Sequence, residues 1–196
     1  MNAPTVLIVP GLREHVAEHW QTLLAFRLPA SGYKVRTVPP MGRGNLDCAA
    51  RVAAIEAELE KIAGPVILVA HSGGVITVVH WALQQRRPIR GALLATPPDF
   101  ERPMPVGYPT MDALRAAGWL PVPRDLLPFP SVVAASRNDP LGKIERAEEL
   151  ARAWGSHFVD IGEAGHLNPA SGYGVWPRAQ ALIRELSMLN AAACAA

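Results

Sequence analysis

Short apolar runs alternate along this chain with longer segments of helical period, and this alternation constrains the fold most. Runs of strand length that are apolar throughout suit parallel strands buried on both faces by crossover helices. The sequence therefore predicts a single three-layer α/β/α domain with about six mostly parallel strands, spanning residues 1–190. The expected strands are Thr5–Val9, Lys34–Val38, Val66–Ala70, Gly91–Ala95, Ser131–Ala135 and Phe158–Ile161, and the expected helices are Val16–Phe26, Asp47–Ile62, Gly74–Gln85, Ile144–Trp154 and Pro177–Leu189.

The stretch from Thr96 to Pro130 interrupts this alternation with recurrent prolines. Proline fixes φ and removes an N–H donor, so the stretch cannot supply a central strand, and only Met111–Gly118 has a helical pattern. We expect an irregular excursion near the site, where long loops often cover ligands, although a purely connecting role stays open. The Ala-rich end, residues 191–196, is expected to form a flexible tail.

Charge, cysteine content and hydropathy exclude several classes of protein. The formal net charge is +2, and the densest basic stretch, residues 86–90, is typical of a solvated helix end and loop, so no nucleic-acid partner is expected. Cys48 and Cys194 do not suggest a disulfide framework, which favours free thiols and a cytoplasmic location. The N-terminus predicts a first strand rather than a signal peptide, and no apolar run has the length of a membrane span.

An apolar run that ends at a serine between small residues indicates a nucleophile. The run Val66-Ile67-Leu68-Val69-Ala70-His71 is followed by Ser72-Gly73-Gly74 and then by a helical pattern. In G-x-S-x-G elbows the serine lies on a sharp strand-to-helix turn, and small residues two positions to each side allow close backbone approach. Ala70 replaces the first glycine, which is a mild departure. An ordinary helix N-cap serine is the alternative explanation.

The acid and base that a serine nucleophile needs follow two later strands. Asp139 lies in the turn after the strand that ends at Ala135, and His166 lies in the loop after the next strand. The order Ser72, Asp139, His166 is that of α/β-hydrolases, in which each residue follows the carboxyl end of a strand. Taken singly, Asp139 could form an Asx turn and His166 could bind a backbone carbonyl.

Other polar residues are weaker candidates for these roles. Asp160 and Glu163 are ranked below Asp139 as the acid, because their positions in the strand and loop suit the imidazole less well. His71 is expected to point away from the nucleophile and to be structural. A His15/His19 pair has helical spacing, but nothing completes a metal site, so no metal is expected.

A tetrahedral intermediate needs two hydrogen-bond donors aimed at its oxyanion. The backbone N–H of Gly73 follows the nucleophile directly, and the loop after the first strand, Pro10-Gly11-Leu12, can supply the second donor. We assign that donor to the N–H of Leu12, with Gly11 permitting the turn. A tight strand-to-helix connection without a catalytic role is the alternative.

Four blocks of the sequence carry a family resemblance. They are Val9-Pro10-Gly11 with Glu18-His19-Trp20, then Val69-Ala70-His71-Ser72-Gly73-Gly74, then Ser136-Arg137-Asn138-Asp139-Pro140, and last Gly165-His166-Leu167-Asn168 with Ser171-Gly172-Tyr173-Gly174 and Trp176-Pro177. The blocks around Asp139 and His166 are the more specific. With them the chain resembles, over nearly its whole length, the small lidless serine hydrolases of the α/β-hydrolase superfamily, which include the retinoblastoma-binding serine hydrolase and its bacterial YdeN-like relatives.

The resemblance implies an α/β-hydrolase fold without a large cap, a Ser-Asp-His triad, no cofactor, and action on small carboxylic esters or amides. One departure concerns a partner. Leu46-Asp47-Cys48-Ala49-Ala50 does not match the retinoblastoma-pocket motif L-x-C-x-E, because alanine replaces the acid. That partner is therefore not expected here.

The sequence thus predicts a serine hydrolase that works through an acyl-enzyme on small acyl substrates. An adaptor protein with a vestigial triad and an acyltransferase that uses the same residues are the alternatives, and the oligomeric state stays open. Gly11, His71, Asn168 and Trp176 are the expected substrate contacts. Trp20, Trp119 and Tyr108 are further candidates for pocket walls, although each also suits a place in the core.

Overall fold

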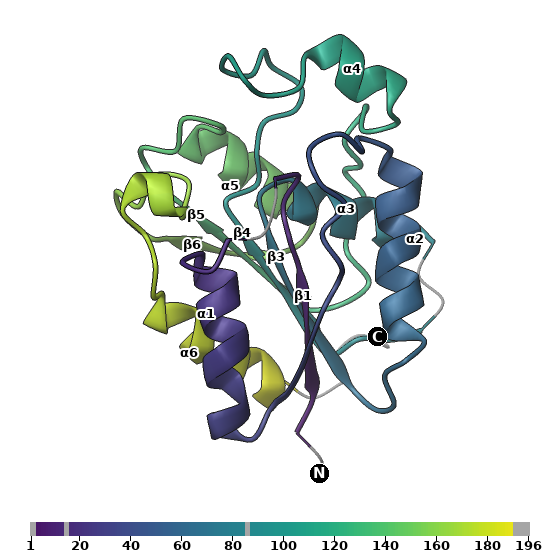
Figure 1. Cartoon of the computed structure of the whole chain (residues 1–196), viewed down its shortest axis with the longest axis vertical. Coiled ribbons are helices and arrows are strands. Elements are labelled where there is room, and N and C mark those ends of the chain that lie inside the picture. Colours follow the sequence, from purple (N-terminus) through teal and green to yellow (C-terminus); the bar gives the residue numbers. More distant parts are fainter. Residues whose placement is uncertain (1–2, 14–15, 85–86, 190–196) are drawn as a thin grey trace.

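The computed structural model describes residues 3–13, 16–84 and 87–189, and within them six parallel strands form one open sheet (Figure 1). The spatial order of the strands is β2-β1-β3-β4-β5-β6, so the chain first winds toward one edge of the sheet and then toward the other. The strands are β1 (Thr5–Val9), β2 (Lys34–Thr37), β3 (Val66–His71), β4 (Gly91–Ala95), β5 (Ser131–Ala135) and β6 (His157–Asp160).

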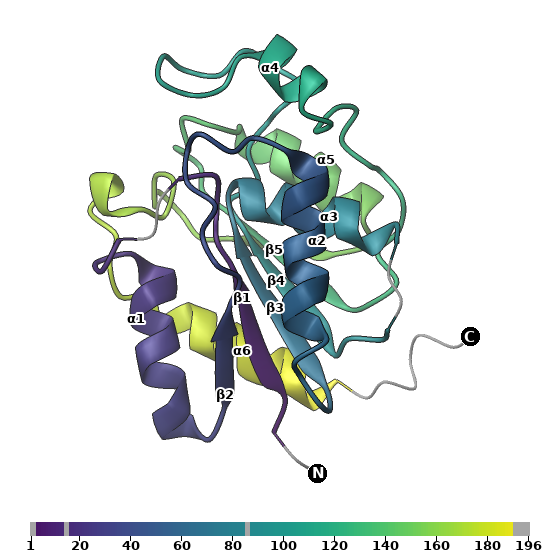
Figure 2. The ribbon, with the colours of Figure 1, turned by 45° about the vertical axis from the view of Figure 1, so that its right-hand side comes forward.

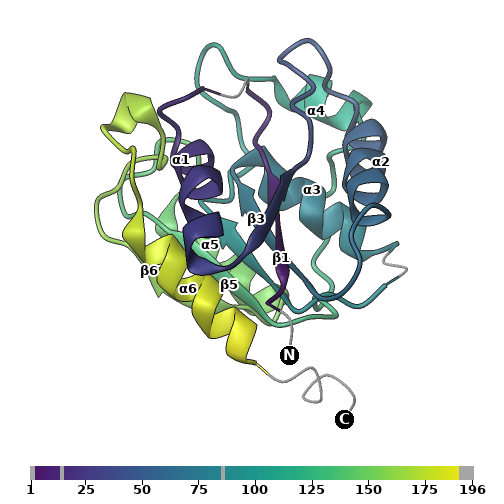
Figure 3. The same ribbon diagram turned by 60° about the horizontal axis from the view of Figure 1, so that its bottom comes forward.

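Side chains that alternate along each strand enter two separate hydrophobic layers. Val6 and Ile8 pack with α1 (Trp20–Arg27) and α6 (Pro177–Met188) on one face of the sheet. Leu7 and Val9 pack with α2 (Cys48–Leu59), α3 (Gly73–Ala82) and α5 (Ile144–Ala153) on the other face, as Figures 2 and 3 show. Burial on both faces explains why β1, β3, β4 and β5 lack any polar alternation. The predicted three-layer α/β class is confirmed.

The boundaries of the elements agree with the sequence pattern except at several ends. β1, β4 and β5 have the expected bounds, and the other strand ends differ by one residue. The first helix begins at Trp20 rather than at Val16, because the side chain of His19 caps it by accepting from the N–H of Gln21. The second helix ends three residues earlier than expected. The expected end of the third helix, Gln85, lies outside the described residues, as does the expected tail 191–196.

The first part of the proline-rich segment, residues 96–130, lies with α4 (Met111–Ala116) beyond the carboxyl ends of the strands, and its last part returns past α5 to the start of β5 (Figures 1 and 2). Apart from this short helix the segment is irregular. Buried Phe100 and Trp119, whose rings meet edge to face, tie it to the hydrophobic core. Arg146 on α5 pairs with Asp99 and Glu101 of the segment. Packing and ion pairs therefore hold this excursion at the end of the sheet where the candidate site lies.

Short 3₁₀ helices complete the described structure, η1 at Leu28–Ser31 and η2 at Pro169–Ser171. None of the helices in the described parts of the chain combines the length and the apolar character needed to cross a membrane.

Candidate active site

Ser72 lies at the sharp turn between β3 and α3. Its φ of 55° and ψ of −130° are unusual for a residue with a side chain, and such backbone strain is typical of functional turns. The N–H of Ser72 donates to the carbonyl of Ala95 on β4 at 3.0 Å. A Cβ added at Gly74 would stand 2.5 Å from the carbonyl oxygen of Pro10 and 2.6 Å from that of Val9. The close approach of α3 to the end of β1 thus explains why a glycine follows the serine at this position.

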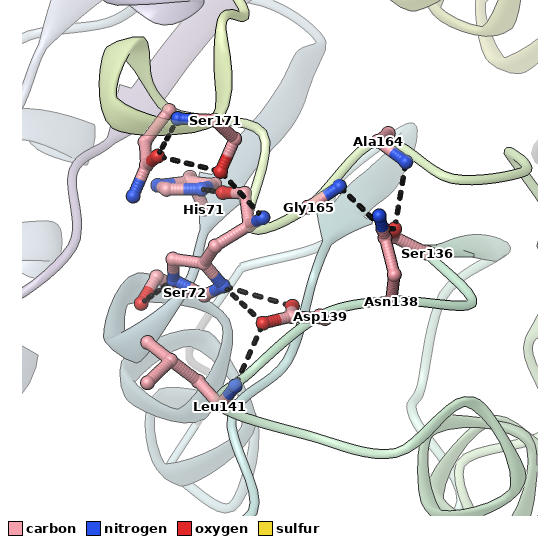
Figure 4. A network of polar contacts seen from close by, with 11 residues as sticks. His71, Ser72, Ser136, Asn138, Asp139, Leu141, Ala164, Gly165 and Ser171 are labelled. Atoms are coloured by element: carbon pink, nitrogen blue, oxygen red, sulfur yellow. Dashed lines mark hydrogen bonds and ion pairs between the residues drawn. The ribbon is translucent and has the colours of Figure 1, made fainter. Parts of the chain in front are cut away.

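Ser72, His166 and Asp139 form a continuous chain of hydrogen bonds, whose two ends, Ser72 and Asp139, are labelled in Figure 4. The Oγ of Ser72 lies 2.8 Å from Nε2 of His166. Nδ1 of His166 lies 2.8 Å and 3.0 Å from the two carboxylate oxygens of Asp139. The side chains of His166 and Asp139 are only 5% and 3% exposed, so the ion pair that forms when His166 takes a proton would be shielded from water. The arrangement suits a base that removes the serine proton.

The loop that carries Asp139 is fastened to the loop that carries His166. Oδ1 of Asn138 accepts from the N–H of Gly165 at 2.7 Å and from the hydroxyl of Ser136 at 2.8 Å. The same hydroxyl oxygen of Ser136 accepts from the N–H of Ala164 at 2.9 Å. Sequence reasoning assigned no role to Ser136 and Asn138, although both belong to the block that was singled out around Asp139.

The loop around His166 is also held from its own carboxyl side. The N–H of His166 donates to Oγ of Ser171 at 3.0 Å, and Oδ1 of Asn168 accepts from both the N–H and the hydroxyl of Ser171 at 2.9 Å. Gly165 has a φ of 54° and stands so close to Ser171 that a Cβ there would lie 2.4 Å from its Oγ. Asn168, an expected substrate contact, thus braces this loop and also lines the cavity described below.

His71 packs against the ring of His166 and bonds its backbone. Its Nε2 lies 2.9 Å from the carbonyl oxygen of His166, to which it donates, and its ring centroid lies 4.9 Å from that of His166 and 4.7 Å from that of His19. Burial, and then the two neighbouring imidazoles, hold the pKa of His71 well below 6.5, so the ring is neutral at physiological pH. His71 thus has the structural position expected of it, and it also forms part of the cavity wall.

The weaker acid candidates do not meet the imidazole. Asp160 accepts from the N–H of Gly162 and from the guanidinium of Arg137, and these bonds, the first above all, lower its pKa. Glu163 is exposed. The acidic partner of His166 in the structure is therefore Asp139.

The two residues expected to supply the oxyanion donors, Gly73 and Leu12, are close neighbours beside Ser72. Gly73 is the first residue of α3, so its N–H has no acceptor within the helix, and the positive end of the helix dipole lies there. A Cβ on Gly73 would stand 2.5 Å from Cγ of Leu12, and one on Gly11 would stand 3.2 Å from Cβ of Ser72. The loop Gly11-Leu12 therefore runs directly alongside the turn at Ser72.

A cavity of about 650 Å³ opens over Ser72 and His166. The loop after β1, the loop before α2, the proline-rich segment and the loop after His166 supply its walls. Its apolar lining includes Leu12, Val16, Leu46, Phe100, Met104 and Leu141, and its polar lining includes Arg13, His19, Gln21, Arg43, His71, Tyr108 and Asn168.

Gly11, His71, Asn168 and Tyr108 line this cavity as expected, but the tryptophans do not. Trp176 is only 8% exposed and packs edge to face against Trp20, with centroids 4.9 Å apart, in the layer under α1 and α6. Trp119 is fully buried among residues of the other layer. The expectation that Trp176 contacts substrate is corrected: its large apolar surface fills the core instead.

Among the described residues no group of three or more histidine, cysteine, aspartate or glutamate side chains is arranged to hold a metal ion. His15, one of the pair considered for a metal, lies outside the described residues. The other, His19, caps α1 with its Nδ1.

Comparisons with known proteins agree with this geometry. The sequence matches the serine hydrolase family over residues 6–185. A YdeN-like hydrolase from Pectobacterium atrosepticum is 32% identical, with 94% of this chain and 91% of that chain covered and a TM-score of 0.78. The ydeN gene product of Bacillus subtilis is 18% identical, with 93% and 98% covered and a TM-score of 0.71.

More distant structures share the fold. Est1E from Butyrivibrio proteoclasticus is 14% identical, with 95% of this chain and 86% of that chain covered and a TM-score of 0.69. None of the curated proteins compared matches the sequence. The match over nearly the whole length and the identity to the Pectobacterium protein show that the chain belongs to the serine hydrolase family and is an enzyme with the α/β-hydrolase fold.

Proposed function

We propose that the protein hydrolyses small carboxylic esters, with Ser72 as the nucleophile, His166 as the general base and acid, and Asp139 as the group that orients His166. The observation that carries the proposal is the unbroken hydrogen-bond chain from Ser72 to Asp139 at the floor of an open cavity. A serine hydroxyl is a weak nucleophile until a base removes its proton, and this chain supplies the base together with its acidic partner.

In the first half of the reaction, Oγ of Ser72 bonds to the carbonyl carbon while its proton passes to Nε2 of His166. The carbonyl oxygen becomes an oxyanion, for which the N–H groups of Leu12 and Gly73 are the proposed donors. When this intermediate collapses, the bond to the alcohol oxygen breaks, and His166 returns the proton to the leaving alcohol. The acyl group stays on Ser72 as an ester.

In the second half, a water molecule takes the place of the alcohol. His166 removes one of its protons as the water oxygen bonds to the acyl carbon, and the same two amides hold the oxyanion. Collapse breaks the bond to Oγ of Ser72, which recovers its proton from His166, and the carboxylic acid leaves. The proton that Ser72 gives up leaves with the alcohol, and a proton from water replaces it, so Ser72 and His166 end the proposed cycle in their starting states.

The cavity favours small acyl groups. Its volume of about 650 Å³ and its largely apolar walls suit an ester of moderate length, and the covering segment is a fixed excursion rather than a large cap. Est1E, which shares the fold, has been crystallised with ferulic acid bound, and the esterase domain of a Rhodothermus marinus protein has a similar fold. These neighbours are compatible with ester substrates.

A fluorophosphonate probe tests the nucleophile, together with hydrolysis of p-nitrophenyl acetate, butyrate and octanoate. Wild type should be labelled and should prefer the shorter esters, whereas Ser72→Ala should lose labelling and about a thousandfold or more in kcat. Ser187→Ala is the matched control, because its hydroxyl bonds Tyr33 and Ile183 on α6, away from the cavity. A folded wild-type protein that neither labels nor turns over any ester would contradict the proposal and favour a binding function.

A further inference from the structure

The charged side chains in the described walls of the cavity are all positive. Among the described residues that form its walls, the charged side chains are Arg13 and Arg43, and no carboxylate is present. The whole chain is nearly balanced, with 19 basic and 17 acidic residues. The excess of positive charge at the cavity is therefore a local feature and not a consequence of composition.

Arg13 directly follows the proposed oxyanion donor, Leu12, and is held by an aromatic ring. The carbon of its guanidinium lies 4.1 Å from the centroid of the Tyr108 ring, which belongs to the proline-rich segment. This cation–π contact joins two walls of the cavity and fixes the guanidinium without neutralising it. The N–H groups of Arg13 remain available at an exposed position.

Arg43 lines the cavity from the loop between β2 and α2. It is exposed, and no carboxylate in the described parts of the chain pairs with it or with Arg13. About half of the other arginines in the described chain differ from these two, since a carboxylate pairs with each of Arg36, Arg102, Arg115, Arg124, Arg137, Arg146 and Arg152. The two arginines at the cavity thus lack the counter-charge that those seven have.

We propose that Arg13 and Arg43 form an anion subsite, and that the preferred substrates are esters that carry a carboxylate at the end distant from the scissile bond. The inference rests on the proposed function and specifies its substrate class. Guanidinium groups bind carboxylates through paired N–H donors, and a cavity whose described walls carry only positive charge also attracts anions. The apolar walls formed by Leu46, Phe100 and Met104 suit the hydrocarbon part of such a substrate.

The test compares two anionic esters with their neutral methyl-ester counterparts, and for each pair the rate of alkaline hydrolysis without enzyme corrects for the difference in intrinsic reactivity. The mono-p-nitrophenyl ester of suberic acid carries a free carboxylate, and its methyl ester is the neutral counterpart. The reversed pair, 4-butyryloxybenzoic acid and its methyl ester, places the carboxylate on the alcohol side. For at least one pair, kcat/KM should favour the anionic ester by about tenfold at low ionic strength, and the preference should shrink in 0.5 M salt, where screening is strong.

The ratio of kcat/KM for the anionic ester to kcat/KM for the neutral ester, measured in each variant, then shows which arginines form the subsite. Arg13→Gln and Arg43→Gln should each lower that ratio by about threefold, as expected for solvent-exposed charges, and the double variant by about tenfold. Arg27→Gln removes an exposed arginine at the end of α1, outside the cavity, and should keep the wild-type ratio. Arg13→Lys, which keeps the charge, should recover part of the ratio.

Two results separate this inference from the proposed function. Hydrolysis of both members of each pair at equal kcat/KM, or ratios unaffected by the double variant, would overturn the anion subsite and leave the esterase intact. Absence of any hydrolysis would overturn the esterase. The subsite is then decided by calorimetric binding of the suberate half-ester to Ser72→Ala, which should weaken when Arg13 and Arg43 are also replaced and would refute the subsite if it did not.

Discussion

The proposed nucleophile and the proposed base of this site are held in place by different means. Ser72 is fixed by backbone shape, since α3 begins against the carbonyls of Pro10 and Val9 and only a glycine fits at position 74. His166 is fixed by side chains, since Asn138, Ser171 and His71 each bond the backbone of its loop. Substitutions that disturb the turn at Ser72 should therefore destabilise the fold, whereas substitutions that disturb the loop of His166 should mainly reduce the rate of catalysis.

The largest expected effect comes from adding one methyl group at the nucleophile turn. Gly74→Ala would normally favour a helix slightly. Here its Cβ meets two carbonyl oxygens of fixed backbone at 2.5 Å and 2.6 Å, so the free energy of unfolding should fall by about 3 kcal/mol. Urea unfolding followed by circular dichroism measures this loss.

Gly174→Ala is the matched control for this change, because a Cβ there meets its neighbours no closer than 3.6 Å. It should change stability by less than about 0.5 kcal/mol. If Gly74→Ala were as stable as wild type, the claim that backbone packing fixes the nucleophile would fail.

A change on the side of the base should affect the rate more than the stability. Asn138→Ala removes the acceptor for the N–H of Gly165 and for the hydroxyl of Ser136, at a position where water can replace it. We expect a loss of only about 1 kcal/mol in stability but about tenfold in kcat with a smaller change in KM, because the loop no longer holds His166 in line with Ser72. Ester hydrolysis and urea unfolding on the same sample give both values.

Gln180→Ala controls for loss of a hydrogen-bonded amide, because Gln180 donates to Ser31 and neither residue lines the cavity. Its kcat should equal that of wild type. A large fall in stability with an unchanged kcat for Asn138→Ala would reverse the contrast drawn between the two regions.

The buried imidazole of His71 should make the stability of the protein sensitive to acid. Its pKa is depressed in the folded protein, so below about pH 6.5 the unfolded chain binds a proton that the folded chain excludes. The folded state therefore loses stability as the pH falls from that value, by up to about 1.4 kcal/mol per pH unit, and gains nothing from this group above it. In His71→Gln that part of the pH dependence should be absent.

Urea unfolding of wild type and His71→Gln at pH 7 and pH 5.5 measures how much the free energy of unfolding of each protein changes with pH. His157→Gln, a change at an exposed histidine, should keep the wild-type slope. Parallel pH profiles for wild type and His71→Gln would show that burial of His71 is not coupled to acid stability.

The sequence permitted prediction of those features that depend on local pattern. Continuous apolar runs located the strands, and the turns after them located Ser72, Asp139 and His166, because residues that end neighbouring parallel strands lie at one edge of a sheet. Trp176 shows where this reasoning ends. Its position at the end of the loop that follows His166 suggested a substrate contact. Whether a loop tryptophan turns inward, however, depends on the packing of Trp20 and α6, which no local pattern encodes.

The bracing of the loops was equally invisible in the sequence. Asn138 bonds Gly165 from another strand connection, and the contact between Arg13 and Tyr108 joins residues about a hundred positions apart. Serine and asparagine are common in any turn, so their presence alone does not distinguish a local turn bond from a long-range one. Only the tertiary structure selects between them.

The smallest effect should come from Ser171, which braces His166 from the exposed side. Ser171→Ala removes the acceptor for the N–H of His166, but water can take its place at this exposed position, and the bonds from Asn138 and His71 remain. We expect kcat to fall about threefold, with stability within about 0.5 kcal/mol of wild type. Combined with Asn138→Ala, the loss in kcat should exceed the product of the single losses, because the two braces hold one loop from opposite sides. A strictly multiplicative double variant would indicate that the two braces act independently and that the loop stays in place when either one is lost.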